Sequence, residues 1–167
     1  MGGLRHIQTV DAVDIIVPPF LHKELTIKAA EAGKHVYVEK PMARSLGECR
    51  SMIRASADAG KRLMVGESYF FSGPHVLARK LIDEGEIGTV QQVRINKAPW
   101  VFTPEEDERL DGGGHDPPWR FDPVLSGGGD YPFMFDHACH LFATARLFGM
   151  YGIVHCIPVS MSAYLRV

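Results

Sequence analysis

Glu39-Lys40-Pro41 is the first group of residues whose types and spacing suit proton chemistry. It follows the run at positions 35–38, in which three residues of four are apolar. Such a run suits a strand covered on both faces, and a residue before proline is held extended, so we expect Lys40 at the carboxyl edge of a parallel sheet. Ligands bind outside that edge in open α/β sheets. A lysine there can donate a proton or orient a hydroxyl group; the alternative is a surface ion pair with Glu39.

Asp136 and His140 form the second group, four residues apart in a helical stretch at about 132–149. Residues at this spacing share one face of a helix. A carboxylate beside an imidazole fixes the ring tautomer, and the ring then exchanges a proton with a substrate. An ordinary helical ion pair is the alternative. His137 and Cys139 are also metal-binding types, but they point elsewhere on a helix and no second ligand group is evident, so we expect no metal.

Two further positions can contact a ligand. Trp119-Arg120 places an arginine beside a large aromatic ring, a pair that can grip a phosphate or a sugar hydroxyl. The alternative is a tryptophan packed on the core with a solvated arginine. His22 follows Pro18-Pro19 at the end of a predicted strand, and it can lie near a ligand bound at that edge of the sheet.

The elements that must position these residues alternate along the first half of the chain. We predict short strands at 13–17, 36–38 and 63–65, with helices between them. The second helix begins with a capping box formed by Ser45 and Glu48. Strands that alternate with helices indicate a parallel sheet with right-handed crossovers. In the second half, a helix follows Ser72, and the alternating pattern over 89–97 predicts a half-exposed antiparallel strand.

The composition excludes several classes of protein. The chain is 46% hydrophobic and 23% charged, which is typical of a soluble globular protein. Its net charge of −2 gives no electrostatic case for nucleic acid. There is no run of about 18 apolar residues, so we expect no membrane span. The three cysteines form no Cys-x-x-Cys pair and suggest reduced thiols in the cytoplasm.

A complete dinucleotide-binding domain would carry a Gly-x-Gly-x-x-Gly turn after its first strand and an acidic residue about 20 positions later. The sequence has neither. The glycine runs at 112–114 and 127–129 lie late in the chain and follow no strand–helix turn of this type.

Several motifs together resemble the Gfo/Idh/MocA family of NAD(P)-dependent dehydrogenases of sugars, inositols and related polyols. The Glu-Lys-Pro tripeptide is the most specific of them. The stretches that carry the resemblance are 15–22, 31–41, 64–66, 81–88, 119–123 and 126–129. Two departures concern the substrate: Asp130-Tyr131-Pro132 stands as an insertion, and Ala143 replaces a frequent aspartate.

The resemblance implies an α/β fold, with a partial Rossmann-like parallel sheet followed by the start of an α/β domain built on a mostly antiparallel sheet. Residues 1–68 would be the second half of a Rossmann dinucleotide-binding domain, and residues 69–167 a truncated substrate-binding and oligomerisation domain. It also implies that the chain is an internal piece of a longer protein, and that it forms homo-oligomers.

Lys40, Asp136 and His140 match the three catalytic positions of the family. The resemblance therefore implies hydride transfer from a sugar or polyol hydroxyl to NAD or NADP. In this reading His140 accepts the hydroxyl proton, Asp136 orients His140, and Lys40 polarises the oxygen.

The residues that would bind the cofactor follow from the same resemblance. Those expected around the nicotinamide ribose are Pro18, Pro19, Glu39, Lys40 and Pro41, with His22 nearby. Trp119 and Arg120 would close over cofactor or substrate. The Lys40-Pro41 peptide bond is a predicted cis bond.

Two other functions stay open. Because the glycine turn is missing, we expect the chain to be inactive by itself, and it can instead serve as a non-catalytic module that self-associates through an exposed sheet edge. Relatives that use NAD in a redox-assisted elimination suggest a glycosidase as the other alternative.

Overall fold

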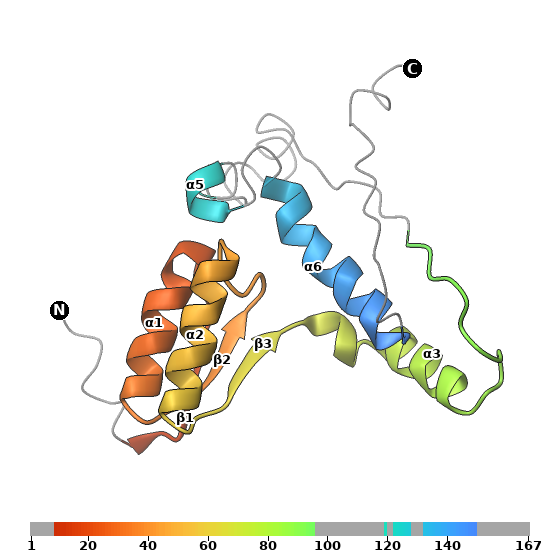
Figure 1. Ribbon diagram of the computed structural model, residues 1–167, viewed down its shortest axis with the longest axis horizontal. Helices are drawn as coiled ribbons and strands as arrows, with labels where there is room; N and C mark the ends of the chain where they lie inside the picture. The colour runs from red at the N-terminus through yellow and green to blue at the C-terminus, as the bar shows by residue number, and fades with distance from the viewer. Residues whose placement is uncertain (1–8, 96–118, 120–121, 128–131, 150–167) are drawn as a thin grey trace, which may run out of the picture.

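The computed structural model describes residues 9–95, 119, 122–127 and 132–149. Its first part is a three-stranded parallel sheet in the order β1-β2-β3 (Figure 1). The strands are β1 (Ala12–Ile15), β2 (His35–Glu39) and β3 (Leu63–Gly66). Helices α1 (Pro19–Glu31) and α2 (Leu46–Asp58) connect them. The predicted order of strands and helices is confirmed.

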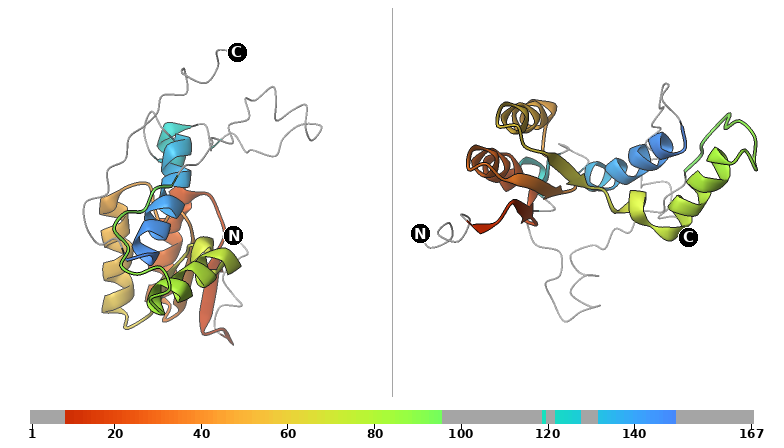
Figure 2. Two further views of the ribbon diagram at one scale, coloured as in Figure 1. Left: turned by 90° about the vertical axis from the view of Figure 1, so that its right-hand side faces the viewer. Right: turned by 90° about the horizontal axis from the view of Figure 1, so that it is seen from below.

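The core lies between β2 and the two helices. Val36 and Val38 are buried and belong to one apolar cluster with Ala29 of α1 and Met52 of α2. Both helices therefore cover the same face of the sheet (Figure 2). We expected cover on both faces of β2, but within the described ranges no element covers the opposite face, where Met64 is 45% exposed.

The start of α2 confirms the predicted cap, with one change. Ser45 Oγ accepts from the backbone N–H of Glu48 at 3.2 Å, which satisfies a donor of the first turn. The carboxylate of Glu48 turns to Arg44 instead of to the backbone N–H of Ser45. It accepts from the backbone N–H of Arg44 at 3.0 Å and from its guanidinium at 2.6 Å. The pKa of Glu48 is lowered mainly by this bond to Arg44.

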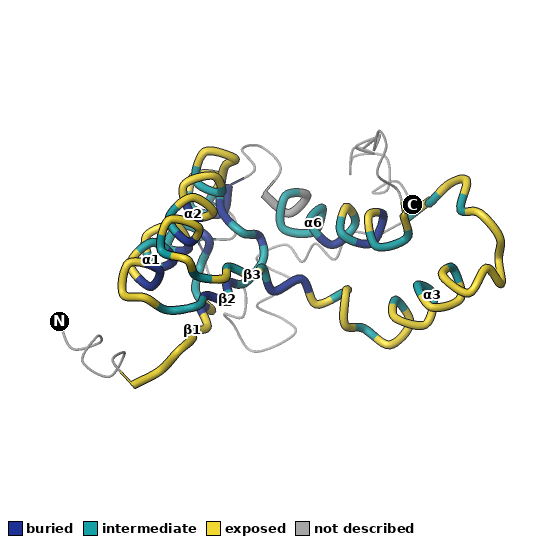
Figure 3. Tube along the Cα trace, turned by 60° about the horizontal axis from the view of Figure 1, so that its bottom comes forward, coloured by how far each residue is buried: buried dark blue, intermediate teal, exposed yellow. Residues whose placement is uncertain are grey.

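The second half of the chain extends away from the sheet. After β3 the chain enters the short 3-10 helix η2 (Ser68–Phe71) and then α3 (Gly73–Asp83). Helix α6 (Pro132–Leu147) begins near the sheet, runs towards α3 and lies beside η2 (Figures 1 and 3). Arg79 of α3 donates to the carbonyl of Leu147 at 2.6 Å, which ties the far end of α6 to α3.

A short helix, α5 (Pro123–Ser126), packs near the start of α1. Asp122 caps it by accepting from the N–H of Val124 at 2.7 Å. Arg44 donates to the carbonyl of Val124 at 3.1 Å, so the loop between β2 and α2 holds α5 in place.

The predicted strand over 89–97 is wrong for the residues that can be compared. Residues 89–95 form no strand, and 96–97 lie outside the described ranges. An extended segment needs a neighbour to complete its backbone hydrogen bonds. No strand of the described sheet lies against this segment.

Candidate active site

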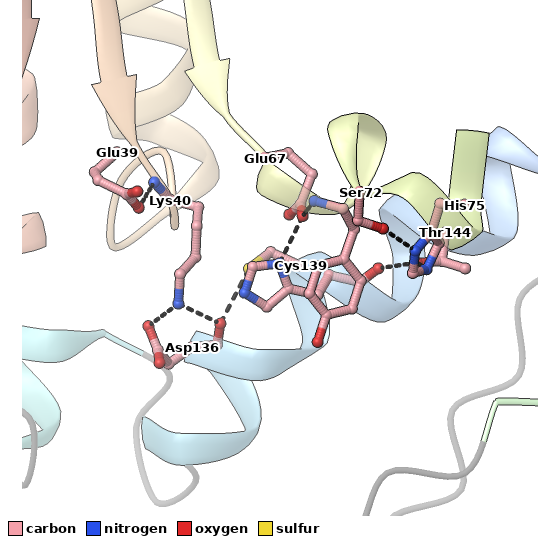
Figure 4. A network of polar contacts seen from close by, with 10 residues as sticks. Glu39, Lys40, Glu67, Ser72, His75, Asp136, Cys139 and Thr144 are labelled. Carbon is pink, nitrogen blue, oxygen red and sulfur yellow. Dashed lines mark hydrogen bonds and ion pairs between the residues drawn. The ribbon is translucent and has the colours of Figure 1, made fainter. Parts of the chain in front are cut away.

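The ends of β2 and β3 bring two charged residues to the same edge of the sheet. Glu39 pairs with Gly66 in the parallel register, so the next residues, Lys40 and Glu67, leave the sheet side by side. Side chains at this edge face the crevice in which α/β proteins bind ligands. Helix α6 lies next to this edge and carries both Asp136 and His140 (Figure 4).

The side chain of Lys40 contacts Asp136 of α6 and not the adjacent Glu39. Its Nζ donates to Asp136 Oδ1 at 2.9 Å and to the Asp136 carbonyl at 3.3 Å (Figure 4). The two side chains are 18% and 17% exposed. Glu39 instead accepts from the backbone N–H of Lys40 at 2.6 Å. The structure therefore favours a partly buried pair at the site over a surface pair of Lys40 with Glu39.

His140 has a carboxylate partner that the sequence did not predict. Its Nδ1 lies 2.6 Å from Glu67 Oε1, and both side chains are buried, at 9% and 7% exposure. The ring stacks on Tyr69 with a centroid distance of 4.3 Å and an interplanar angle of 14°. We expected Asp136 to orient His140; the carboxylate at Nδ1 is that of Glu67, while Asp136 holds Lys40.

A sequence signal for Glu67 existed. It follows Gly66 at the end of a predicted strand, and the same position after β2 singled out Lys40. The Glu67 carboxylate also accepts from the backbone N–H of Tyr69 at 3.0 Å, which caps η2. Glu67 therefore both caps η2 and contacts His140, and the residues around it in the sequence indicate neither role in particular.

Cys139 lies closer to this cluster than we expected. Potential ligand atoms of Glu67, Cys139 and His140 lie within 4.8 Å of one another. Metal binding requires the thiolate. Burial raises the pKa of the Cys139 thiol to about 11, and its sulfur donates to the Asp136 carbonyl at 3.0 Å. Both features favour a neutral thiol at this position.

His22 is fully buried and lies behind the site. Its Nε2 is 2.7 Å from the carbonyl of Val17, and its Nδ1 is 3.0 Å from the carbonyl of Pro41. The ring thus links the end of β1 to the turn after β2, and its nitrogens face backbone. The predicted cis peptide bond between Lys40 and Pro41 is confirmed.

The remaining expected cofactor residues lie at the start of α1 and near α5. Pro18 and Pro19 form the N-cap and first position of α1, and no side chain caps this helix. Trp119 is half-buried, and its carbonyl accepts from the N–H of Asp122 at 3.3 Å. Arg120 lies outside the described residues.

The start of α1 lies at the carboxyl end of β1 and has no side-chain cap, so its first backbone N–H groups can receive an anionic group of a ligand. The sequence carries no Gly-x-Gly-x-x-Gly turn for the pyrophosphate. No helix in the described ranges is both long and apolar enough to cross a membrane.

Comparison with known proteins shows which family the chain belongs to. The family model described as "Oxidoreductase family, NAD-binding Rossmann fold" matches residues 4–67, and the one described as "GFO/IDH/MocA C-terminal domain" matches residues 75–157.

Two curated relatives and one solved structure cover most of the chain. The 2,7-anhydro-N-acetylneuraminate hydratase of Escherichia coli is 36% identical over 83% of the chain, and levoglucosan dehydrogenase of Pseudarthrobacter phenanthrenivorans is 34% identical over 89%. A structure of levoglucosan dehydrogenase with NADH and levoglucosan matches 83% of the chain, with a TM-score of 0.63 and 34% identity.

The chain spans 35% of the length of each of these proteins. The two family models adjoin at the passage from β3 to α3, and together they include Lys40, Glu67, Asp136 and His140. The chain belongs to the Gfo/Idh/MocA family of oxidoreductases, whose N-terminal domain is an NAD-binding Rossmann fold.

Proposed function

We propose that this site belongs to an NAD(P)-dependent dehydrogenase that oxidises a secondary hydroxyl group of a sugar, inositol or related polyol. The observation that carries the proposal is the ion pair between Lys40, at the end of β2, and Asp136 of α6, one helical turn from His140. When bound, NAD(P)⁺ supplies the hydride acceptor.

The roles of the residues follow from their charges. The Lys40 ammonium group beside the substrate oxygen favours the negative charge that develops as the hydroxyl proton leaves. His140 takes that proton as general base. Asp136 holds the amine of Lys40 by the 2.9 Å bond. Pro18, Pro19 and Pro41 border the nicotinamide ribose.

The substrate class is suggested by the relatives. Levoglucosan dehydrogenase and the anhydro-neuraminate hydratase are both named for sugars that carry an internal anhydro bridge. We therefore propose levoglucosan as the first substrate to test, with myo-inositol as the representative of the unbridged polyols. The hydratase supports a second candidate, a redox-assisted elimination at the same site, as in the NAD-dependent glycosidases of the family.

We also propose that residues 1–68 and 69–167 are two domains and that the chain forms a homo-oligomer in the cytoplasm. An exposed sheet edge such as β1 is a template for pairing, which supports self-association. Light scattering on the purified chain tests the proposed self-association, and a monomer at all concentrations contradicts it.

The proposed function is tested with the purified 167-residue chain. NADH and NADPH are titrated separately by fluorescence, and reduction of NAD⁺ or NADP⁺ is then followed with levoglucosan and with myo-inositol. Saturable binding with substrate-dependent reduction that Lys40→Ala abolishes would support the dehydrogenase and would overturn the expectation that the chain is inactive by itself. Lys23→Ala, which removes an exposed lysine of α1, is the control. The absence of saturable binding favours the non-catalytic, self-associating module, and full activity of Lys40→Ala refutes the role given to Lys40.

A further inference from the structure

Two different carboxylates hold Lys40 and His140, whereas we expected Asp136 to orient His140. Asp136 Oδ1 lies 2.9 Å from the amine of Lys40, and Glu67 Oε1 lies 2.6 Å from Nδ1 of His140. Glu67 is 73 residues from His140 in the sequence, and it is brought there because it leaves the sheet directly after β3. The contact therefore joins the nucleotide-binding sheet to the helix that carries the proposed base.

The contact restricts where the proton of the ring can reside. An ionised carboxylate accepts hydrogen bonds and donates none, so beside an ionised Glu67 it is Nδ1 that carries the proton. The neutral imidazole then keeps its lone pair on Nε2. The partner of one ring nitrogen sets the chemistry of the other, as it does for histidines that bind metals.

Neighbouring groups restrict the ring further. Tyr69 stacks on it from η2, and the Glu67 carboxylate that holds Nδ1 is itself held by the backbone N–H of Tyr69 at 3.0 Å. Thr144, one turn further along α6, donates to the carbonyl of His140 at 2.8 Å. The ring plane and the carboxylate are thus fixed by the same 3-10 turn, so the geometry does not depend on a mobile side chain.

We propose that Glu67 is the positioning residue of the site, which holds His140 as the Nδ1–H tautomer so that Nε2 is the atom that exchanges the substrate proton. Glu67 does not touch the substrate. The consequence for catalysis rests on the proposed function: when Nε2 takes the hydroxyl proton, the ring becomes a cation and the buried Glu67 carboxylate stabilises it.

The tautomer is measured on the intact chain without any ligand. Long-range ¹H–¹⁵N correlation spectra of the chain labelled with ¹⁵N-histidine distinguish protonated from unprotonated ring nitrogens, and His140→Asn identifies the signals of His140. At a pH where the ring is neutral, we expect a protonated Nδ1 and an unprotonated Nε2. A neutral ring protonated at Nε2 overturns the proposal.

Two variants sharpen the test. Glu67→Met removes the acceptor that faces Nδ1, so we expect the population to shift towards the Nε2–H tautomer. Glu31→Met, which changes an exposed glutamate at the end of α1 in the same way, is the matched control and leaves the spectrum of His140 unchanged. An unchanged tautomer in folded Glu67→Met overturns the proposal.

Measurements of kcat distinguish the positioning role of Glu67 from the proposed dehydrogenase function on which it rests. If the chain transfers hydride, we expect Glu67→Gln to lower kcat by about 10²- to 10⁴-fold, the range of general acid–base assistance, with a smaller change in KM. Full kcat in Glu67→Gln with loss in Lys40→Ala refutes the role of Glu67 and leaves the dehydrogenase standing. An inactive chain with the Nδ1–H tautomer in place refutes the function of the chain and leaves the positioning contact standing.

Discussion

Lys40 and Asp136 lie 96 residues apart in the sequence, yet Nζ of the first donates to Oδ1 of the second at 2.9 Å. One residue belongs to the end of a sheet strand and the other to α6. Because the pair is largely withdrawn from solvent, its attraction is less screened than that of a surface pair. It therefore contributes to the docking of α6 against the sheet.

A double-mutant cycle on this pair measures its contribution to docking. We expect Lys40→Met and Asp136→Leu to show a coupling of about 0.5–3 kcal/mol in the free energy of unfolding, the range for residues in contact. Urea unfolding followed by circular dichroism gives the values.

The control cycle uses Arg54 and Asp58, whose side chains are 85% and 73% exposed at a separation of 3.8 Å. There the coupling should stay below about 0.5 kcal/mol, as for exposed pairs on helices. Equal couplings in the two cycles would contradict the buried character of the Lys40–Asp136 pair.

His22→Ala should destabilise the chain strongly. The substitution leaves a cavity and removes the group that faces the carbonyls of Val17 and Pro41, so we expect a loss of about 2–4 kcal/mol in the free energy of unfolding. Lys23→Ala changes the next residue, which is exposed, and should stay within about 0.5 kcal/mol of the wild type. Similar unfolding curves for the two variants would contradict the structural role given to His22.

Alkylation of Cys139 should depend steeply on pH. Burial raises the pKa of its thiol to about 11 from an ordinary value of 9.0, and only the thiolate reacts. Below the raised pKa, the labelling rate should rise about tenfold for each unit of pH, and it should lag behind the rate in urea-unfolded chain at every pH below it. Mass spectrometry of iodoacetamide-treated peptides gives both rates. Rapid labelling of the folded chain at neutral pH would show that the thiol is not buried.

Gly127→Ala should detach α5. Gly127 has φ +83°, and a Cβ built there would lie 2.9 Å from the Cα of Arg44, a backbone atom that cannot move aside. Hydrogen exchange at the Ser126 amide, which donates to Asp122 at 2.9 Å, reports the loss of the helix. Gly60→Ala has φ +64° but no neighbour within 4 Å, so it should add backbone strain of about 1–2 kcal/mol and leave α5 protected.

The features that the sequence predicted are those that short patterns encode. Apolar runs and a capping residue place the strands and the start of α2, and the spacing of Asp136 and His140 places both on one helix. The partner of His140 was missed because a hydrogen bond across 73 residues depends on how η2 packs on α6. The strand at 89–97 failed for a related reason: alternation marks a segment that can pair, and pairing needs a neighbour.

Helix α6 sets the spacing between the two halves of the site. Asp136 and His140 meet the ends of two adjacent strands, and their separation along the axis is about 6 Å because a helix rises 1.5 Å per residue. Loops around the site can therefore lengthen or change without altering the distance between the amine of Lys40 and the imidazole of His140. A single residue inserted between the two, by contrast, would turn one of them about 100° away and undo the spacing at once.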